Sequence, residues 1–144
     1  MAKLKHENIV SVLDIFEENK TSYLVMEYLD GDTLQSFLDD NTLIDYEKVR
    51  SVAIHLLKSL HEIHSKDVLH LDLKPSNIIV KPDNSPVLID FGAARVVELG
   101  NINNLSISVG TEAYAAPEQF EHIVKPFDAY TDLYAFGAIL YHIW

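Results

Sequence analysis

The stretch that decides the fold of this chain is His70-Leu71-Asp72-Leu73-Lys74-Pro75-Ser76-Asn77. It places a carboxylate (Asp72), a cation (Lys74) and a side-chain amide (Asn77) on one short loop that follows a β-prone run. A carboxylate can accept a proton, an ammonium can neutralise a phosphate, and an amide oxygen can hold a cation. The loop is therefore the first candidate for a reactive site.

A second carboxylate, Asp90, follows an apolar run and precedes Phe91 and Gly92. The glycine allows the backbone to turn sharply there, because it has no Cβ. Carboxylate oxygens are preferred ligands of hard cations, so a phosphate held by a metal can lie between Asp72 and Asp90. Taken singly, either aspartate would more often end a turn or a strand, and only their shared context favours the reactive interpretation.

The pattern on either side of this loop predicts a mixed α+β chain. Two β-prone runs, Ile9 to Phe16 and Thr21 to Tyr28, are separated by a polar turn and predict an antiparallel hairpin. Apolar residues recur three and four positions apart from Asp45, a candidate N-cap, through His64, which predicts a long amphipathic helix. The other predicted elements are a helix over Thr33 to Leu38, strands at Val68 to His70, Ile78 to Val80 and Val87 to Ile89, a turn at Pro82 to Asn84, a long functional loop over residues 92–122, and a last helix from Ala129 or Thr131.

The composition favours one domain, or part of one, and excludes several classes of function. The 144 residues are 48% hydrophobic and carry a formal net charge of −11, which opposes binding to nucleic acid or anionic lipid. The chain has no cysteine, which excludes disulfides and favours a reducing compartment such as the cytoplasm. The apolar run Leu133 to Trp144 is shorter than the roughly 20 residues of a membrane span. We therefore expect no nucleic-acid partner and no membrane span in this chain.

The ordered motifs resemble those of the protein kinase family. Residues His70 to Asn77 match the catalytic-loop pattern H-R-D-x-K-x-x-N at every fixed position but one, and Asp90 to Gly92 reads D-F-G. Gly110 to Glu118 resembles the family's G-T-x-x-Y-x-A-P-E run, and Thr131 to Gly137 resembles its D-x-Y-x-x-G helix. Leu24 to Leu29 resembles its hinge.

Within that family the chain resembles the serine/threonine type. Lys74 with Pro75, and Thr111 ahead of the A-P-E run, are similar to that type, whereas tyrosine kinases usually carry an Ala/Arg-type loop. The resemblance implies transfer of the ATP γ-phosphate to Ser or Thr hydroxyls of a protein substrate, with ATP and Mg²⁺ required. The amino-acid sequence of residues 88–95 and 110–141 further resembles that of bacterial-type members.

The resemblance also implies a role for each matching residue. Asp72 is expected to accept the proton of the substrate hydroxyl, and Lys74 to bind the nucleotide and steady the transferring phosphate. Thr111 is expected to bridge these two side chains. Asn77 and Asp90 are expected to hold Mg²⁺ against the nucleotide oxygens.

Further implied roles concern the adenine and the framework. Backbone groups of Glu27 and Leu29 are expected to meet adenine at the hinge, with Ile79 in the apolar floor beneath it. Asp132 is expected to anchor the backbone of the catalytic loop. Three residues are expected to form an internal apolar spine: His70, Phe91 and Val12.

Two departures from the family pattern change these expectations. Leu71 stands where many members carry the arginine that receives an activation-loop phosphate, so ordering of that loop by phosphorylation is not expected. The sequence also begins near the end of the family's C-helix and stops inside the helix that contains Asp132. The Gly-rich loop, the phosphate-pairing Lys with its Glu partner, and the Arg partner of Glu118 are not encoded in it. We therefore expect the isolated chain to be poorly stable and inactive.

The expected fold is α+β, a truncated two-lobed protein kinase-like fold. Residues 1–29 are expected to form small-lobe strands and the hinge, and residues 30–144 the large lobe with the catalytic loop and activation segment. The expected function is that of a serine/threonine protein kinase domain fragment. Two alternatives stay open: a non-catalytic, truncated kinase-like scaffold, and a small-molecule phosphotransferase with an H-x-D-x-x-x-x-N loop. Lys74 and Ala116-Pro117-Glu118 argue against the second.

Overall fold

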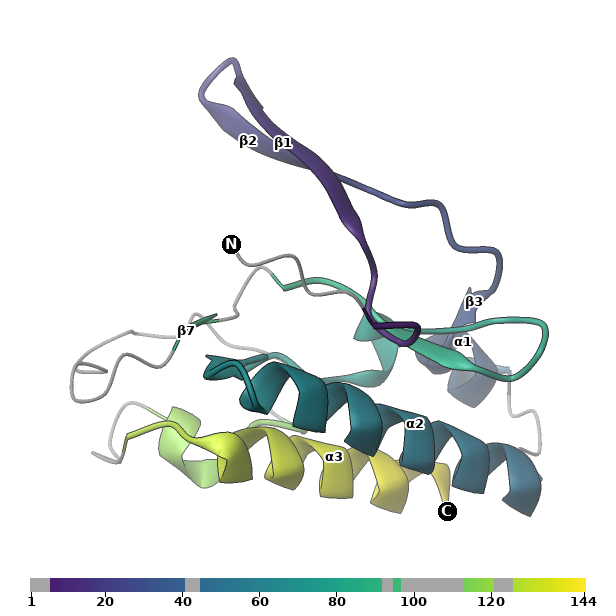
Figure 1. Ribbon diagram of the computed structural model, residues 1–144. Coiled ribbons are helices and arrows are strands. Elements are labelled where there is room, and N and C mark those ends of the chain that lie inside the picture. Colours follow the sequence, from purple (N-terminus) through teal and green to yellow (C-terminus); the bar gives the residue numbers. More distant parts are fainter. Residues whose placement is uncertain (1–5, 41–44, 92–94, 97–112, 121–125) are drawn as a thin grey trace.

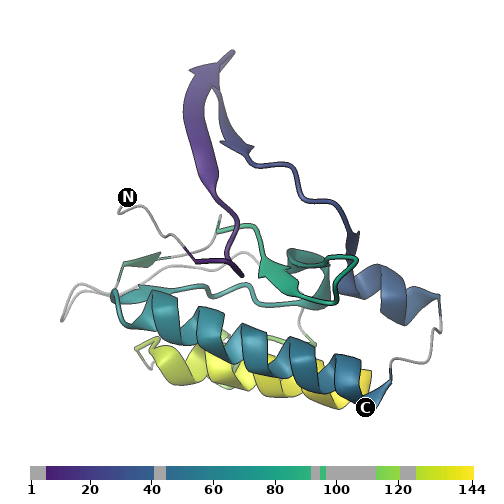
Figure 2. The same ribbon diagram turned by 45° about the vertical axis from the view of Figure 1, so that its right-hand side comes forward.

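The structure, a computed structural model, describes residues 6–40, 45–91, 95–96, 113–120 and 126–144. A two-stranded hairpin projects from a body that contains two long helices, a small sheet and a short helix (Figure 1). The two long helices lie side by side, and the sheet lies between them and the hairpin (Figure 2). This arrangement, with a strand hairpin followed by a largely helical body, confirms the predicted α+β class.

The projecting hairpin consists of β1 (Val12–Glu18) and β2 (Thr21–Met26), which pair antiparallel as predicted. Its turn is formed by Asn19 and Lys20, whose φ angles are 51° and 62°. Two successive left-handed residues are what a type I′ turn requires, and that turn matches the twist of paired strands. Every residue of both strands is exposed, so the hairpin depends on its own ladder and cross-strand contacts.

The first strand begins later than the predicted start at Ile9. Ile9 and Val10 are buried and lie beside Leu88: the N–H of Val10 donates to the Leu88 carbonyl at 3.0 Å, and the N–H of Leu88 donates to the Asn8 carbonyl at 2.9 Å. Because their backbone pairs with this distant segment, they cannot extend the hairpin. The sequence pattern was correct in being β-prone but assigned the wrong partner.

A three-stranded antiparallel sheet lies above the helices, in the order β3 (Asp32–Thr33), β5 (Ile78–Val80), β6 (Pro86–Leu88). Gly31 precedes β3 with a φ of 148°, in a region that side chains rarely adopt. A Cβ at this position would lie 2.4 Å from the carbonyl oxygen of Val80. The close approach of β3 to β5 therefore requires a glycine at position 31.

The helices begin where the sequence carries capping residues. They are α1 (Leu34–Asp39), α2 (Tyr46–His64) and α3 (Ala129–Ile143). The side chains of Thr33, Asp45 and Asp128 each accept a backbone N–H from the first turn of the helix that follows. Each cap satisfies a donor that has no partner within the helix. The predicted N-cap at Asp45 and the end of its helix at His64 are confirmed.

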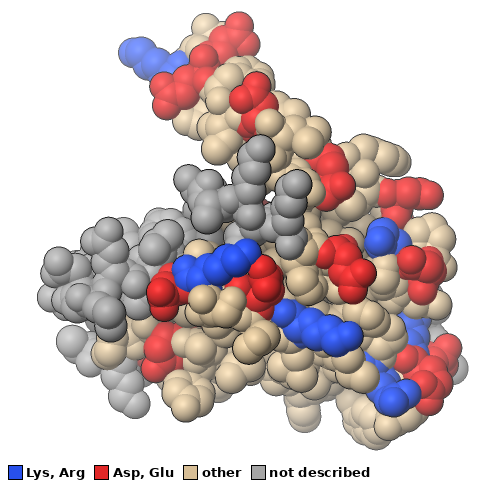
Figure 3. Space-filling model, in the orientation of Figure 1, with Lys and Arg blue, Asp and Glu red and all other residues tan. Residues whose placement is uncertain are grey.

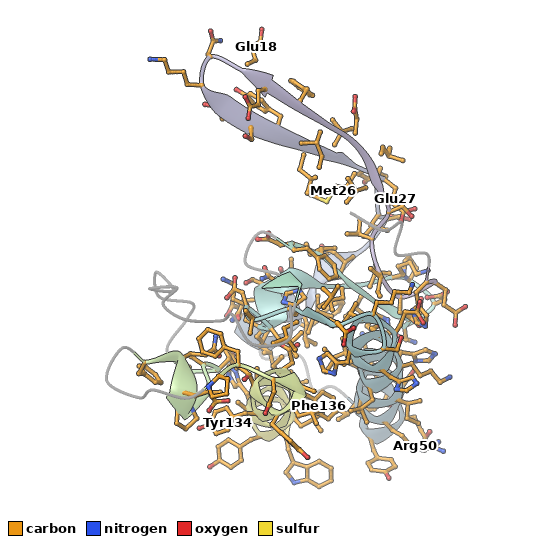
Figure 4. The ribbon with its side chains drawn as sticks, turned by 60° about the vertical axis from the view of Figure 1, so that its left-hand side comes forward. Glu18, Met26, Glu27, Arg50, Tyr134 and Phe136 are labelled. Carbon is orange, nitrogen blue, oxygen red and sulfur yellow. The ribbon has the colours of Figure 1, made fainter. Side chains whose placement is uncertain are left out.

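The core lies where α2 packs against α3 on one side and the sheet on the other. Figure 4 shows Phe136 on the side of α3 that faces α2, whereas Tyr134 lies on the other side of the helix and is half exposed. Burial of such apolar side chains supplies most of the free energy that favours folding. The largest apolar side chains that are fully buried in this core are those of Leu34, Leu56, Leu60, Ile63, Ile78, Leu88 and Ile139.

Four short strands differ from the prediction. No strand was predicted at β3, and β6 begins and ends one residue before the predicted Val87 to Ile89. β4 (Val68–Leu69) ends one residue early, because the next N–H, that of His70, donates to a side chain of α3 rather than to a strand. β4 pairs with β7 (Arg95–Val96), which lies in the stretch predicted as loop. A strand of two residues has no periodic pattern, so sequence reasoning could not find β7. Most of the remaining residues of that stretch lie outside the described part of the chain.

The composition predicted that the chain binds no nucleic acid and does not span a membrane. The surface charges and the lengths of the helices concern these two predictions. In the face shown in Figure 3, acidic side chains follow the hairpin, and basic and acidic side chains are interspersed over the body. Within the described residues, none of the helices is long and apolar enough to cross a membrane.

Two glycines should respond to alanine substitution with opposite signs. In the gene product that contains residues 1–144, Gly31→Ala should destabilise the fold by about 1–3 kcal/mol, because the new Cβ clashes with Val80 and the left-handed backbone is strained. Gly137→Ala is the control: it lies in α3, a Cβ there meets no described atom within 4 Å, and helix propensity predicts a gain of about 0.5–1 kcal/mol. Thermal unfolding of both variants measures this, and equal shifts of the midpoint would contradict it.

Candidate active site

The three polar side chains of the predicted loop come together in the structure. The Lys74 ammonium lies 2.9 Å from Oδ2 of Asp72. Nδ2 of Asn77 donates to the backbone carbonyl of Asp72 at 2.8 Å and to its carboxylate at 3.2 Å. Pro75 begins a short 3₁₀ helix of one turn, Pro75–Asn77, which brings the Asn77 amide back toward Asp72. The loop thus folds its cation and its amide around one partly buried carboxylate.

A buried carboxylate on α3 holds the backbone of this loop. Asp132 is 1% exposed, and its two oxygens accept from the N–H of His70 at 2.9 Å and from the N–H of Leu71 at 2.8 Å. Nε2 of His64 donates to the same carboxylate at 2.8 Å. Hydrogen bonds to an ionised acceptor are about twice as strong as neutral ones. The predicted anchoring role of Asp132 is confirmed.

His70 connects the loop to the segment that carries the second carboxylate. Its ring is buried and lies 4.9 Å from that of Phe91. The N–H of Asp72 approaches Nδ1 at 3.4 Å, so Nδ1 accepts and Nε2 carries the proton that is donated to the Ile89 carbonyl at 3.2 Å. The contact of His70 with Phe91 confirms part of the predicted spine. Val12 is 40% exposed in β1, so its expected burial in that spine is wrong for this structure.

Strand pairing brings Asp90 to the same end of the sheet as Asn77. Ile78 lies opposite Leu88 in the β5–β6 pair, so the residue before β5 and the residues after β6 leave the sheet together. The N–H of Ile89 donates to the carbonyl of Asn77 at 2.9 Å, which joins the two segments directly. Asp90 then turns in the left-handed region, with a φ of 59°, and is exposed. Its side chain is therefore accessible from solvent beside the loop.

The oxygen donors at this edge fit Mg²⁺. The Asn77 amide uses its nitrogen toward Asp72, which leaves the amide oxygen for a cation, and Asp90 supplies a carboxylate. Mg²⁺ prefers such oxygens and keeps further positions for phosphate and water. Among the residues that the structure describes, no group of three His, Cys, Asp or Glu side chains could hold a metal, so a cation here would need those extra oxygens.

The predicted nucleotide residues lie at the base of the hairpin and in the sheet. The N–H of Glu27 donates to the Ser11 carbonyl at 3.0 Å, and Oε1 of Glu27 accepts from the N–H of Ser11 at 2.7 Å. Figure 4 shows Glu27 where the hairpin joins the body. Leu29 and Ile79 are half-buried. Contact of these residues with adenine stays a prediction, and Thr111 lies outside the described residues.

The segment before α3 is fastened to both the loop and the helix. The Thr131 hydroxyl donates to Glu118 at 2.8 Å. The Tyr114 hydroxyl and Nδ1 of His142 are 2.6 Å apart, and burial raises the pKa of Tyr114. Gln119, which sequence reasoning missed, donates from Nε2 to the Leu71 carbonyl at 2.8 Å. Its local signal was a proline that begins a helical turn followed by a glutamine at the third position.

Comparison with known proteins agrees with this geometry. The family model described as the protein kinase domain matches residues 1–144. A probable serine/threonine-protein kinase of Clostridium acetobutylicum is 34% identical over 142 residues, which cover 99% of this chain and 21% of that protein. Serine/threonine-protein kinase TIO of Arabidopsis thaliana is 36% identical over 144 residues, which cover 100% and 11%. Serine/threonine-protein kinase 36 of Pongo abelii is 38% identical over 143 residues, which cover 99% and 11%.

The loop of residues 70–77, its anchor Asp132 and the nearby Asp90 contain the residue types that the protein kinase family pattern has at these positions. This chain belongs to the protein kinase family. It spans about a fifth or less of the length of the three relatives just described. Identity to the bacterial relative is similar to identity to the plant and animal relatives, so it does not favour a bacterial type.

Burial of His70 predicts a pH dependence of stability. Burial lowers the pKa of His70, although the carboxylates of Asp132, Asp72 and Asp90 act in the opposite direction. Below the unfolded value of about 6.5, the unfolded chain therefore binds a proton that the folded chain resists. The contribution of neutral His70 to stability is therefore fully present above about pH 6.5 and is lost as the pH falls toward the pKa of His70 in the folded protein.

His70→Phe should reduce the pH dependence of stability, because phenylalanine keeps an aromatic ring in this buried position but has no group that titrates. The measurement is the free energy of unfolding of parent and variant between pH 7.5 and 5.5. Parallel curves for the two proteins would show that His70 is not the group responsible.

Proposed function

We propose that residues 1–144 are part of a serine/threonine protein kinase domain that transfers the γ-phosphate of ATP to Ser or Thr hydroxyls of proteins. The observation that carries this proposal is the cluster of Asp72, Lys74 and Asn77, joined to the Asp90 segment by the hydrogen bond between Ile89 and Asn77. The three relatives described above are all named as serine/threonine-protein kinases, which supports it. ATP, Mg²⁺ and a protein substrate are the partners it requires.

The residues of the loop would divide the work of phosphoryl transfer. The Asp72 carboxylate accepts the proton of the attacking hydroxyl and orients that hydroxyl. Lys74, 2.9 Å from Asp72, places a positive charge where the transferring phosphate arrives. Asn77 and Asp90 would hold Mg²⁺, which when bound neutralises charge on the phosphate oxygens. Thr111 would join Asp72 and Lys74 when the substrate is bound.

The remaining assignments complete the proposal. Residues 1–29 would be the small-lobe strands and hinge, with Glu27 and Leu29 at the adenine and Ile79 beneath it, and residues 30–144 the large lobe. Residues 1–144 alone would be inactive, because this proposal needs the small-lobe Lys–Glu pair, which the sequence does not contain. We place the protein in the cytoplasm, since the absence of cysteine fits a reducing compartment.

The direct test uses the gene product that contains residues 1–144. Labelled ATP with Mg²⁺ is offered together with a generic protein substrate, and separately with a panel of small alcohols. We expect label on Ser and Thr of the protein. Transfer to a small alcohol alone would establish the small-molecule phosphotransferase, and no transfer to any acceptor would favour the non-catalytic scaffold.

Asp72→Asn in that gene product should lower kcat/KM by about 10²–10⁴-fold, because the amide keeps the shape but cannot accept the proton. Asp67→Asn is the matched control: Asp67 is exposed and lies in the turn between α2 and β4, outside the loop of residues 70–77. Phosphorylation rates of parent and variants measure the effect. Activity of Asp72→Asn within about tenfold of the parent would refute the role given to this carboxylate.

Asp90→Asn should remove most of the gain in ATP affinity that Mg²⁺ provides, by about tenfold, since a neutral amide is a weaker ligand of a hard cation. Asparagine tolerates the left-handed backbone at φ 59°, so the loop should keep its shape. Asp67→Asn again serves as control, because Asp67 has a φ of 56°. Calorimetric titration with ATP, with and without Mg²⁺, gives the result, and an unchanged Mg²⁺ dependence would exclude Asp90 as ligand.

A further inference from the structure

The side chain of Gln119 makes two hydrogen bonds, one as acceptor and one as donor. Its Oε1 accepts from the N–H of Ala116 at 2.9 Å, and its Nε2 donates to the carbonyl of Leu71 at 2.8 Å. Ala116 belongs to the A-P-E segment, whereas Leu71 lies in the loop of residues 70–77, 48 positions before Gln119. The side chain therefore bridges two segments that meet only in the folded protein.

Both contacts of this bridge can be made by one side chain because an amide carries an acceptor and a donor. At the third position of a helical turn, Glu and Gln can equally well accept the N–H of the residue before the turn. Only Gln also carries a donor, because an ionised carboxylate can only accept. The cap on Ala116 would be satisfied by either residue, so the contact to Leu71 is the part that specifically requires glutamine.

The Leu71 carbonyl is a sensitive place for such a contact. Leu71 has a φ of 65°, a left-handed conformation that costs a non-glycine residue about 1–2 kcal/mol. Asp132 holds its N–H at 2.8 Å, and Gln119 holds its carbonyl at 2.8 Å. The peptide unit after Leu71 is planar and ends at Cα of Asp72. Fixing its carbonyl therefore limits the directions in which the Asp72 side chain can leave the backbone.

We propose that Gln119 is a positioning residue for phosphoryl transfer: its amide couples the A-P-E segment to the backbone of Leu71 and so orients Asp72. This inference rests on the proposed function for its effect on rate, and on geometry alone for the coupling. The Leu71 side chain is buried at 4% exposure and offers no charge to a phosphate, whereas its backbone carbonyl accepts the hydrogen bond from Gln119.

Two variants separate the two hydrogen bonds. Gln119→Glu keeps the acceptor for Ala116 but replaces the donor to Leu71 with a carboxylate oxygen, whereas Gln119→Met has a similar length and removes both. Gln35→Glu is the matched control, because Gln35 donates only to the exposed Asp39 on α1. All are made in the gene product that contains residues 1–144.

The first measurement is steady-state phosphorylation. Gln119→Glu loses one hydrogen bond and places a carboxylate against the Leu71 carbonyl, whereas Gln119→Met loses both hydrogen bonds. Each variant should therefore lower kcat about tenfold, with KM for ATP within about twofold of the parent. Gln35→Glu should match the parent. A kcat of Gln119→Glu equal to that of the parent would overturn the proposal.

The second measurement is amide hydrogen exchange, which reports local opening without any activity. Exchange at the N–H of Asp72, which shares a peptide unit with the Leu71 carbonyl, should rise about tenfold in both Gln119 variants. Exchange at Ala116, whose N–H donates to Gln119, should rise only in Gln119→Met. If Ala116 also loses protection in Gln119→Glu, the turn has simply come apart and the proposal is overturned. Should the gene product transfer no phosphate, the proposed function fails. Exchange at the N–H of Asp72 then decides the coupling by itself: a rise supports it and no rise overturns it.

Discussion

One buried carboxylate on a helix determines the shape of the reactive loop. Asp132 accepts two consecutive backbone N–H groups, and Leu71, the second of them, is held in a conformation that leucine does not favour. The strain persists because the charged acceptor compensates it. Without this carboxylate, the two N–H groups would lose their partners in a dry interior, which is costly. The positions of Asp72 and Lys74 follow from this anchor.

The sheet supplies the second constraint, which concerns distance rather than conformation. Antiparallel pairing of β5 with β6 returns the chain to the level of the loop, so Asn77 and Asp90 approach the same edge although they are separate in sequence. The buried ring of His70 lies between the loop and this segment and bonds to the Ile89 carbonyl. Helix, loop and sheet thus each restrict a different degree of freedom of the site.

Sequence reasoning succeeded where the signal is local. The cap at Asp45 and the polar side chains of residues 70–77 are encoded by neighbouring residues, and the structure places them as expected. It failed where the deciding partner is remote. Val10 was assigned to the hairpin because nothing nearby reveals its pairing with Leu88. Gln119 carries a local capping signal, but its contact with Leu71 exists only after folding.

The anchor also imposes an order of events during synthesis. Asp132 is 62 residues downstream of His70 and 61 residues downstream of Leu71. At about 5–20 residues per second, a ribosome makes the loop roughly 3–12 s before the aspartate that shapes it. The nascent loop must wait in another conformation, since its left-handed leucine has no compensation until then. A nascent chain that stalls before α3 would therefore carry every loop residue of the site without the backbone conformation that Asp132 imposes on Leu71.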